Sequence, residues 1–233
     1  MTFYLAVDTA TEACSVAVWI DGRARERFEP MQREHTARLM PMIQELLADC
    51  GKSIGQIDGL VCGIGPGSFA GLRIGVGVVK GLALARDLPV VGVSSLAMLA
   101  QRAMPADAQV AAVIDARMSE VYFGAYRRGD AGLATIMLAD RVCAAPAVPV
   151  LPAGRWAGVG TGWGRYEPEL RKAVAVEPTR IDAGALPHAE DALTLGVPEF
   201  AAGRAVSADV LAPAYLRDRV ALTLAEQAAA RGA

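Results

Sequence analysis

The polar residues best suited to chemistry stand at the end of the first apolar segment. Residues 3–7 are apolar, Asp8 follows them, and Thr9 and Thr11 come next. A carboxylate beside two hydroxyls at a strand tip could hold Mg²⁺ and a phosphate group, because hard cations prefer oxygen ligands. The same residue types also satisfy the backbone of a tight turn through short side-chain hydrogen bonds. We favour the turn and keep the ion site as the alternative.

A glycine-rich segment, residues 65–68, stands between a predicted strand and a predicted helix. Its Gly-x-Gly-x-x-Ala spacing is that of a dinucleotide-binding loop, which also needs an acid at the end of the next strand. That strand ends at Ser94 without an acid, and Pro66 removes one backbone N–H from the cradle, so NAD binding is not expected. Together with Asp8 and Thr9, the candidates for a residual phosphate site are Gly65, Gly67 and Ser68.

The chain has few residues suited to nucleophilic catalysis or to binding a metal. Ser68 lacks a Gly-x-Ser-x-Gly elbow, and the chain has two histidines, so we expect Ser68 to cap the following helix. His35 lies in the first turn of a predicted helix, and the residue four positions on is Leu39, which cannot bind a metal. We therefore expect a helix-start or surface histidine. The four cysteines form no Cys-x-x-Cys pair, which predicts reduced thiols and no metal site.

Composition limits the class of protein. The chain has 233 residues, 53% of them hydrophobic, and a net charge of −2, so it can bury a large core and is not intrinsically disordered. The near-neutral charge argues against a dedicated nucleic-acid binder. The longest uncharged stretches, such as residues 88–101, have 14 residues, whereas a membrane span needs about 20. The start meets an acid at Asp8 and lacks a basic segment, so we expect a soluble, cytoplasmic protein.

The order of the predicted elements repeats. The first copy has strands over residues 3–8, 14–20, 23–28, 57–64 and 88–93, with helices over 34–50, 70–86 and 94–100. A second apolar strand ending on an acid, Asp115, opens a shorter copy, and residues 156–163 again lead from a strand into a glycine-rich turn. Chance is the alternative, but three features recur in one order. We predict an internal duplication, with domains over residues 1–104 and 105–233.

Two apolar helices, residues 34–50 and 70–86, are the best candidates for an interaction surface. The first carries aliphatic residues at helical spacing, and the second contains the glycine pairs 71/75 and 77/81. Each interior glycine costs a helix about 1 kcal/mol relative to alanine, which suggests a close backbone approach. Such residues are more often core than interface. Two apolar helices in one small half nevertheless exceed what one sheet face needs, which favours self-association or a partner.

Six segments together resemble one family. They are Asp8–Ala17, Arg33–Ile43, Gly65–Gly75, Gly92–Leu96, Ile114–Tyr122 and Pro213–Arg217. Their combination, over nearly the whole chain, resembles the TsaB (YeaZ) family of bacterial tRNA threonylcarbamoyladenosine biosynthesis proteins. The resemblance implies an α/β fold of two tandem actin-like/RNase-H-like (ASKHA) domains, with mixed five-stranded sheets flanked by helices.

The resemblance also implies a role. Such a chain would be a non-catalytic partner of a TsaD-type transferase, working with a TsaE-type ATPase and meeting tRNA indirectly. It would carry no cofactor of its own, since ATP, Mg²⁺ and a metal are expected on the partner subunits. In the family, the two N-terminal-domain helices bind TsaD or pair into a homodimer. The candidate contacts here are Leu39, Met42, Ile43, Leu46, Val76, Val79 and Leu84.

Two departures from the catalytic relatives agree with that role. Leu39 stands where TsaD-like members have the second histidine of a His-x-x-x-His motif, and Thr9 stands where an ASKHA phosphate loop commonly has glycine. The alternative is a small nucleotide-dependent kinase or hydrolase that uses Asp8, Thr9 and the 65–68 loop. A weaker one is a sugar-kinase-like binding module without a partner.

Overall fold

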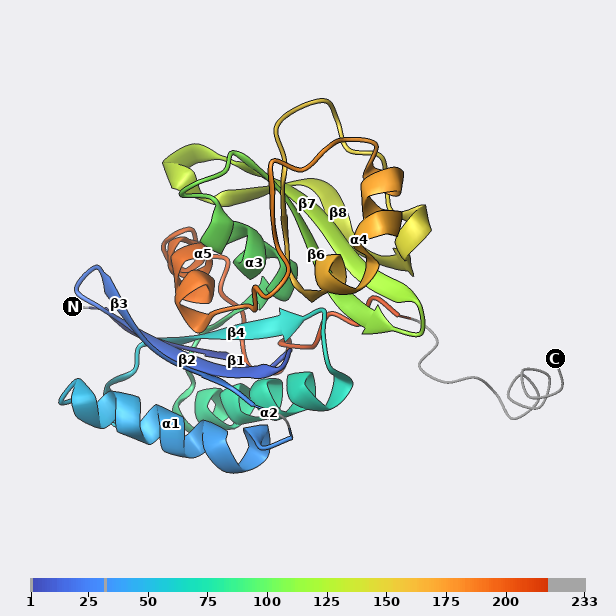
Figure 1. Ribbon diagram of the computed structural model, residues 1–233. Coiled ribbons are helices and arrows are strands. Elements are labelled where there is room, and N and C mark those ends of the chain that lie inside the picture. The colour runs from blue at the N-terminus through green and yellow to red at the C-terminus, as the bar shows by residue number, and fades with distance from the viewer. Residues whose placement is uncertain (1, 32, 218–233) are drawn as a thin grey trace, which may run out of the picture.

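The first half of the chain forms a mixed five-stranded sheet. A computed structural model describes residues 2–31 and 33–217 (Figure 1). The strands are β1 (Phe3–Asp8), β2 (Ala13–Ile20), β3 (Arg23–Pro30), β4 (Gly59–Gly65) and β5 (Val90–Ser94), in the spatial order β3-β2-β1-β4-β5. β1 and β2 are antiparallel, as are β2 and β3, whereas β4 runs parallel to β1 and β5 parallel to β4.

The second half repeats this sheet. Its strands are β6 (Gln109–Arg117), β7 (Glu120–Arg128), β8 (Ala134–Ala144), β9 (Ala157–Val159) and β10 (Arg180–Asp182), in the order β8-β7-β6-β9-β10. The pairing directions are also the same. The predicted duplication and the predicted fold class are therefore confirmed. The second copy is shorter because a 3₁₀ turn, Ala145–Ala147, stands where the first copy has a full helix.

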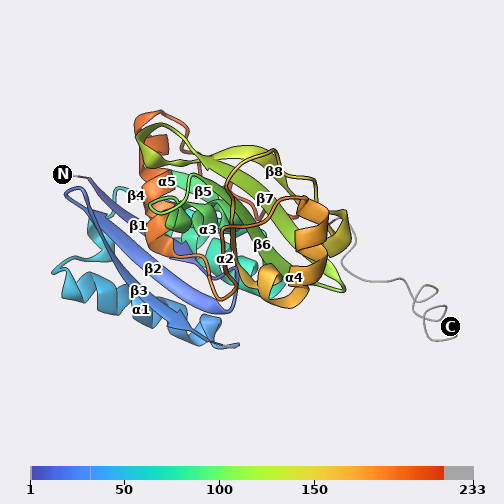
Figure 2. The same cartoon turned by 45° about the horizontal axis from the view of Figure 1, so that its top comes forward.

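Helices cover both faces of each sheet. They are α1 (His35–Asp49), α2 (Phe69–Arg86), α3 (Ser95–Ala103), α4 (Thr161–Val174) and α5 (Ala189–Ala201), with two further 3₁₀ turns at Ile54–Gln56 and Asp130–Gly132. α1 and α2 pack on the outer face of the first sheet, and α4 packs on the outer face of the second. α3 and α5 lie between the two sheets (Figures 1 and 2).

The two central helices cross between the halves. α3 follows the first sheet in the chain but packs on β6, β7 and β8, whereas α5 follows the second sheet and packs on β1, β2 and β4. The predicted boundary between residues 104 and 105 therefore separates the two sheets, while the packing of these helices crosses it. Each half completes the core of the other.

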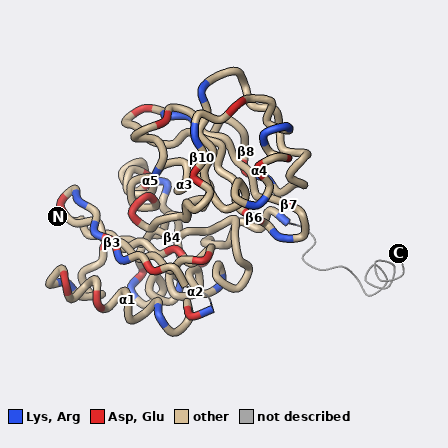
Figure 3. Tube along the Cα trace, in the orientation of Figure 1, with Lys and Arg blue, Asp and Glu red and all other residues tan. Residues whose placement is uncertain are grey.

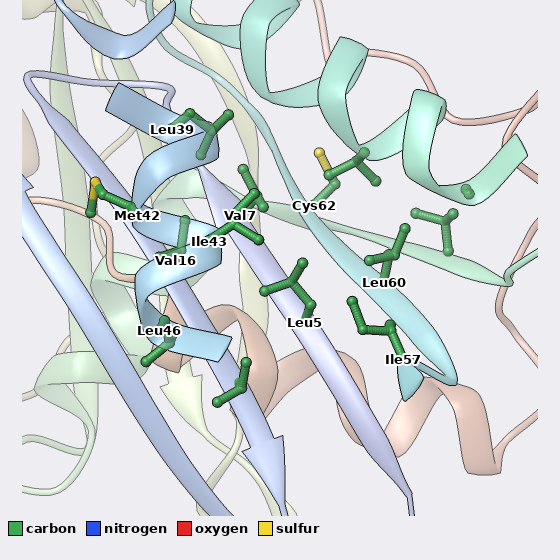
Figure 4. Close-up of a cluster of buried hydrophobic side chains, with 14 of the residues drawn as sticks. Leu5, Val7, Val16, Leu39, Met42, Ile43, Leu46, Ile57, Leu60 and Cys62 are labelled. Atoms are coloured by element: carbon green, nitrogen blue, oxygen red, sulfur yellow. The ribbon is translucent and has the colours of Figure 1, made fainter. Parts of the chain in front are cut away.

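The core of the first half follows the alternation of its strands. Leu5 and Val7 on β1 point toward α1 and α2, and Val7 lies beside Ile43 of α1 in one buried cluster (Figure 4). Ala6, between Leu5 and Val7, points to the opposite face and packs against α5. Successive strand residues face opposite sides of a sheet, so β1 is apolar over residues 3–7 because both of its faces are covered.

Candidate interdomain cleft and helix face

Asp8 is completely buried at the end of β1. Its Oδ2 accepts a hydrogen bond from the Ala10 backbone N–H at 3.3 Å, and its Oδ1 has no hydrogen-bond partner. A Cβ at Gly63 on β4 would overlap this Oδ1, so the glycine leaves the room for the carboxyl group. Burial raises the pKa of Asp8 to about 7. As folded, Asp8 is closed off from solvent and does not line the cleft described below, and its assignment to a phosphate site stays a prediction.

Thr9 is also buried and holds α2 against the β1–β2 loop. Its Oγ1 donates a hydrogen bond to the Gly71 carbonyl oxygen at 2.7 Å. A Cβ at Gly71 would overlap the Thr9 carbonyl oxygen, and one at Gly67 would overlap the Ala10 carbonyl oxygen. The close backbone approach predicted from the glycines is therefore real, and at these positions the approaching backbone belongs to the same chain. Thr9 contributes to this packing and does not line the cleft, and its assignment as a phosphate ligand also stays a prediction.

The glycine-rich loop begins α2 as expected. Ser68 is the N-cap, and its Oγ accepts a hydrogen bond from the Gly71 N–H at 3.3 Å. The Ser68 N–H donates to the Ala10 carbonyl oxygen at 2.7 Å. Gly65 is buried against Leu72 with a φ of +96°, a conformation that favours glycine. Of the five residues predicted to bind phosphate, Gly67 and Ser68 line the cleft; Asp8, Thr9 and Gly65 do not.

His35 begins α1, as predicted, but its ring is buried rather than exposed. Nε2 lies 3.1 Å from the Thr11 carbonyl oxygen and 3.2 Å from that of Ala13, so an N–H at this position ties the start of α1 to the β1–β2 loop. This role of His35 could not be predicted from the sequence, because the two carbonyl oxygens lie more than 20 residues upstream. Across residues 2–31 and 33–217, no three His, Cys, Asp or Glu side chains gather in a way that could hold a metal ion.

A cleft of about 810 Å³ separates the two halves on the side where β1 and β6 end. The first half lines it with the β1–β2 loop, Arg33, His35 and the first turns of α2. The second half contributes residues 114–117 and Tyr122, and residues 214–217 complete the lining. Its volume is within the range of small-molecule sites, and polar and apolar side chains line it, so it is the first candidate for a ligand.

One ion pair joins the two walls of the cleft, and two more lie within the second half. Arg117 lies 3.2 Å from Glu12 in the first half and 3.2 Å from Asp115 in the second. Arg165 on α4 is 3.6 Å from the same Asp115. Arg117, Met118 and Ser119 all have φ between +53° and +64°, a conformation that L residues rarely adopt. The β6–β7 turn thus presents Arg117 and Met118 outward at the mouth of the cleft.

A C-terminal segment, residues 205–217, straps the two halves together. Val206 and Val90 exchange backbone hydrogen bonds at the edge of the first sheet. The Ala214 N–H donates a hydrogen bond to the Ile64 carbonyl oxygen. Arg217 then reaches the second half, where Nη2 donates to the Ala116 carbonyl oxygen at 3.0 Å and pairs with Glu120 at 2.5 Å. Figure 1 shows this strap as the red segment that runs toward the β6–β7 hairpin.

A second polar cluster, absent from the sequence-based expectations, joins the halves behind the cleft. The Glu26 carboxylate accepts hydrogen bonds from Ser15 Oγ at 2.7 Å and from the Glu190 N–H at 3.1 Å, and it pairs with His188 Nδ1 at 2.7 Å. Arg102 on α3 lies 3.2 Å from Asp191 on α5. Burial raises the pKa of Asp191 to about 7, and Arg102 opposes the shift. These contacts join α3 and α5 to β3.

The predicted partner contacts require a correction. Leu39, Met42, Ile43, Leu46, Val76 and Val79 are buried in the core between the helices and the sheet; Leu84, at 62% exposure, is the one on the surface. Helical spacing identifies the apolar face of a helix, and here that face packs on its own sheet. The outer face of α2 instead presents Gly77, Gly81, Leu84 and Ala85, and the outer face of α1 presents Ala37, Gln44 and Ala48.

Comparison with known proteins identifies the family. The chain is 43% identical to the tRNA threonylcarbamoyladenosine biosynthesis protein TsaB of Escherichia coli, over 93% of this chain and 95% of that protein. The chain belongs to the TsaB family. The TsaB of Haemophilus influenzae is 40% identical, over 93% of this chain and 94% of that protein. A TsaD family model, described as tRNA N6-adenosine threonylcarbamoyltransferase, matches residues 29–149.

A solved structure of the family has the same fold. The crystal structure of YeaZ from Pseudomonas aeruginosa superposes with a TM-score of 0.86 at 44% identity, covering 93% of this chain and all of that chain. The TsaB fold described above is therefore that of a family member known by experiment. Among the residues the structure describes, no helix has the length and apolar character needed to cross a membrane.

Proposed function

We propose that this chain is a non-catalytic subunit for forming N6-threonylcarbamoyladenosine in cytoplasmic tRNA, where it binds and activates a TsaD-type threonylcarbamoyltransferase. The names of its relatives place TsaB proteins in that biosynthesis. The observation that carries the non-catalytic role is the use made of Asp8 and Thr9. Both are buried and committed to internal packing, so the phosphate machinery that an ASKHA enzyme would need is not offered to a ligand.

The outer face of α1 and α2 is the proposed docking surface. Among the described residues, and apart from the neighbouring backbone of α2 itself, no atom lies within 4 Å of a Cβ built at Gly77 or at Gly81. Packing within the described part of the subunit therefore does not require glycine at these two positions. A smooth face of glycine and alanine with Leu84 beside it allows another helix to approach closely. In isolation the same face would pair two copies of the chain. A TsaE-type ATPase would join the assembly, and ATP, Mg²⁺ and the metal would be held by the partner subunits.

The test is tRNA modification in vitro with purified TsaD-type and TsaE-type subunits, with and without this chain. We expect product with the chain and none without it. Full modification without the chain would contradict the proposal. Tight ATP–Mg²⁺ binding with turnover by the chain alone, measured by calorimetry and phosphate release, would favour the alternative of a small nucleotide-dependent enzyme.

A surface variant tests the docking face. Substitutions at Leu46 or Val79 would unfold the core, so Leu84→Asp is the informative change. It places a charge on the proposed interface without touching the core, and we expect loss of the complex on size exclusion. The matched control is Ile136→Asp on β8, where the side chain is 60% exposed and lies in the other half. Equal complex formation by both variants would exclude this face.

A further inference from the structure

One exposed cluster at the mouth of the cleft is not used by the function proposed above. It consists of Arg33, Phe69, Arg73, Arg117, Met118 and Tyr215, and we name it the arginine–aromatic surface. The Arg73 guanidinium stacks on Phe69, with Cζ 3.7 Å from the ring centroid. Arg73 Nε also donates to Tyr215 Oη at 3.3 Å, and the two rings lie 5.6 Å apart. Phe69 is 42% and Tyr215 49% exposed, so both rings are ordered by contacts and still open to solvent.

The arginine–aromatic surface carries positive charge that the described residues do not neutralise. Arg33 and Arg73 take part in no ion pair within the part of the chain that the structure describes. The lining of the cleft and the groups in direct contact with it hold five arginines, at positions 33, 73, 117, 165 and 217. They hold four carboxyl groups, those of Asp8, Glu12, Asp115 and Glu120.

This local excess stands out against the rest of the molecule. The whole chain has a net charge of −2, and Figure 3 shows basic and acidic residues interspersed over both halves. A broad basic face, as found on dedicated nucleic-acid binders, is therefore not the signal here. The signal is a few unpaired guanidinium groups placed beside exposed rings.

We infer that the arginine–aromatic surface contacts the RNA substrate directly, at an unpaired or distorted part of the tRNA. This inference rests on the proposed function, which brings tRNA to the complex. A guanidinium stacked on a ring keeps in-plane N–H groups for phosphate oxygens. Exposed aromatic rings are the platforms on which unpaired bases stack. The N-terminus of α2, an 18-residue helix that begins at Phe69, adds a favourable dipole at the same place.

A protein partner is the other class of occupant, and the observations favour RNA. The outer face of α1 and α2 has the small apolar residues that suit helix packing. On the arginine–aromatic surface, Arg33 and Arg73 have no carboxylate partner among the described residues, whereas Arg117 pairs with Glu12 and Asp115. A protein partner would have to supply the missing carboxylates from its own side. A polyanion supplies negative charge at every nucleotide, irrespective of sequence.

Photo-crosslinking separates the two classes. Tyr215→p-benzoylphenylalanine places a photoreactive group on this surface, and Val150→p-benzoylphenylalanine, at a 66% exposed position in the second half, is the control. Each protein is irradiated with unmodified tRNA transcript, alone and with the TsaD-type and TsaE-type subunits. A ribonuclease-sensitive adduct at position 215, stronger than at 150, supports the inference. An adduct with a protein subunit only, or no adduct in either mixture, overturns it.

Charge reversal measures the contribution of the two unpaired arginines. The Arg33→Glu/Arg73→Glu variant is compared with Arg155→Glu, which reverses an exposed arginine elsewhere. In the complex we expect tRNA binding about tenfold weaker for the double variant and unchanged for the control. The slope of log K against log salt should fall by about 1.4, because each lost phosphate contact contributes about 0.7. Unchanged affinity and slope would refute the contact.

The two proposals fail in different ways. Complex formation on size exclusion reports the docking face, and the double variant should still form the complex. Cross-linking is scored on the chain alone as well, so the RNA contact is measured even where no partner assembles. Loss of assembly with a retained RNA adduct would contradict only the docking face, and the reverse result would contradict only the RNA contact.

Discussion

Thr9 Oγ1 donates a hydrogen bond to the Gly71 carbonyl oxygen at 2.7 Å, which joins the end of β1 to the first turn of α2 across 62 residues of chain. The contact is possible because glycine at position 71 lets the Thr9 backbone lie against the helix. Because of this contact, the polar residue that follows β1 packs against α2. The glycines of α2 therefore fall into two groups. Gly71 and Gly75 lie against Thr9, whereas a Cβ at Gly77 or Gly81 would meet open space among the described residues.

A matched pair of glycine substitutions tests the difference between these two groups. Gly71→Ala should destabilise the protein by about 2 kcal/mol or more, because its Cβ would overlap the Thr9 carbonyl oxygen. Gly77→Ala should stabilise it by up to about 1 kcal/mol, because the site is open and alanine favours the helix. Urea unfolding measures both. Equal effects of the two substitutions would contradict the distinction.

Asp8 should make stability depend on pH. Its folded pKa, about 7, lies above the value of about 3.9 in an unfolded chain, so between these values the folded state holds the extra proton. Stability therefore falls as pH rises through this window and levels off above about 7. Asp8→Asn should reduce the loss of unfolding free energy between pH 5 and pH 8 by about 2 kcal/mol, since one pKa unit corresponds to about 1.4 kcal/mol.

Asp191 should lower stability over the same pH range as Asp8, and its substitution provides the control. Its pKa is also raised to about 7 by burial, so Asp8→Asn leaves a second contribution in place. The Asp8→Asn/Asp191→Asn variant should show the flattest profile in urea unfolding at pH 5, 6, 7 and 8. An Asp8→Asn profile that runs parallel to that of the unchanged protein would contradict the assignment.

The sequence was sufficient for the elements and their repetition. The apolar strand over residues 3–8 and the cap at Ser68 are local signals, and each was confirmed. Ser94 caps α3 in the same way, accepting hydrogen bonds from the Leu96 and Ala97 N–H groups. The matching strand orders then follow from the repeat of a strand that ends on aspartate.

The packing of segments far apart in the chain could not be predicted from the sequence. The periodicity of Leu39, Met42 and Ile43 identifies an apolar helix face but not what covers that face. The assignment of these residues to a partner surface was therefore wrong. The crossing of α3 and α5 between the sheets depends on contacts that no local pattern encodes. The burial of Asp8 is of the same kind, because its carboxyl group lies against Gly63 on β4, 55 residues later in the chain.

The ion pair between Arg117 and Glu12 should contribute little to stability. Both side chains are at least half exposed, and such pairs are worth at most about 1 kcal/mol. Glu12→Gln should thus change the midpoint of thermal unfolding by less than a few degrees, whereas His35→Ala, which removes a buried hydrogen-bonded ring, should cost about 1–3 kcal/mol. Differential scanning calorimetry compares them. A larger loss in Glu12→Gln would show that the cleft walls depend on this pair.

A bulky residue at Gly81 should separate folding from assembly. Leucine favours the helix over glycine by roughly 0.5–1 kcal/mol, and the position is open, so Gly81→Leu should unfold at an equal or higher urea concentration. The same side chain would hold a second helix away from the outer face of α2. We therefore expect at least tenfold weaker binding to a TsaD-type subunit in calorimetric titration, together with loss of the homodimer. Gly184→Leu, at an exposed glycine of the second half with open space around it, is the matched control and should bind normally. Normal binding by Gly81→Leu would show that the partner docks elsewhere, whatever the stability of the variant.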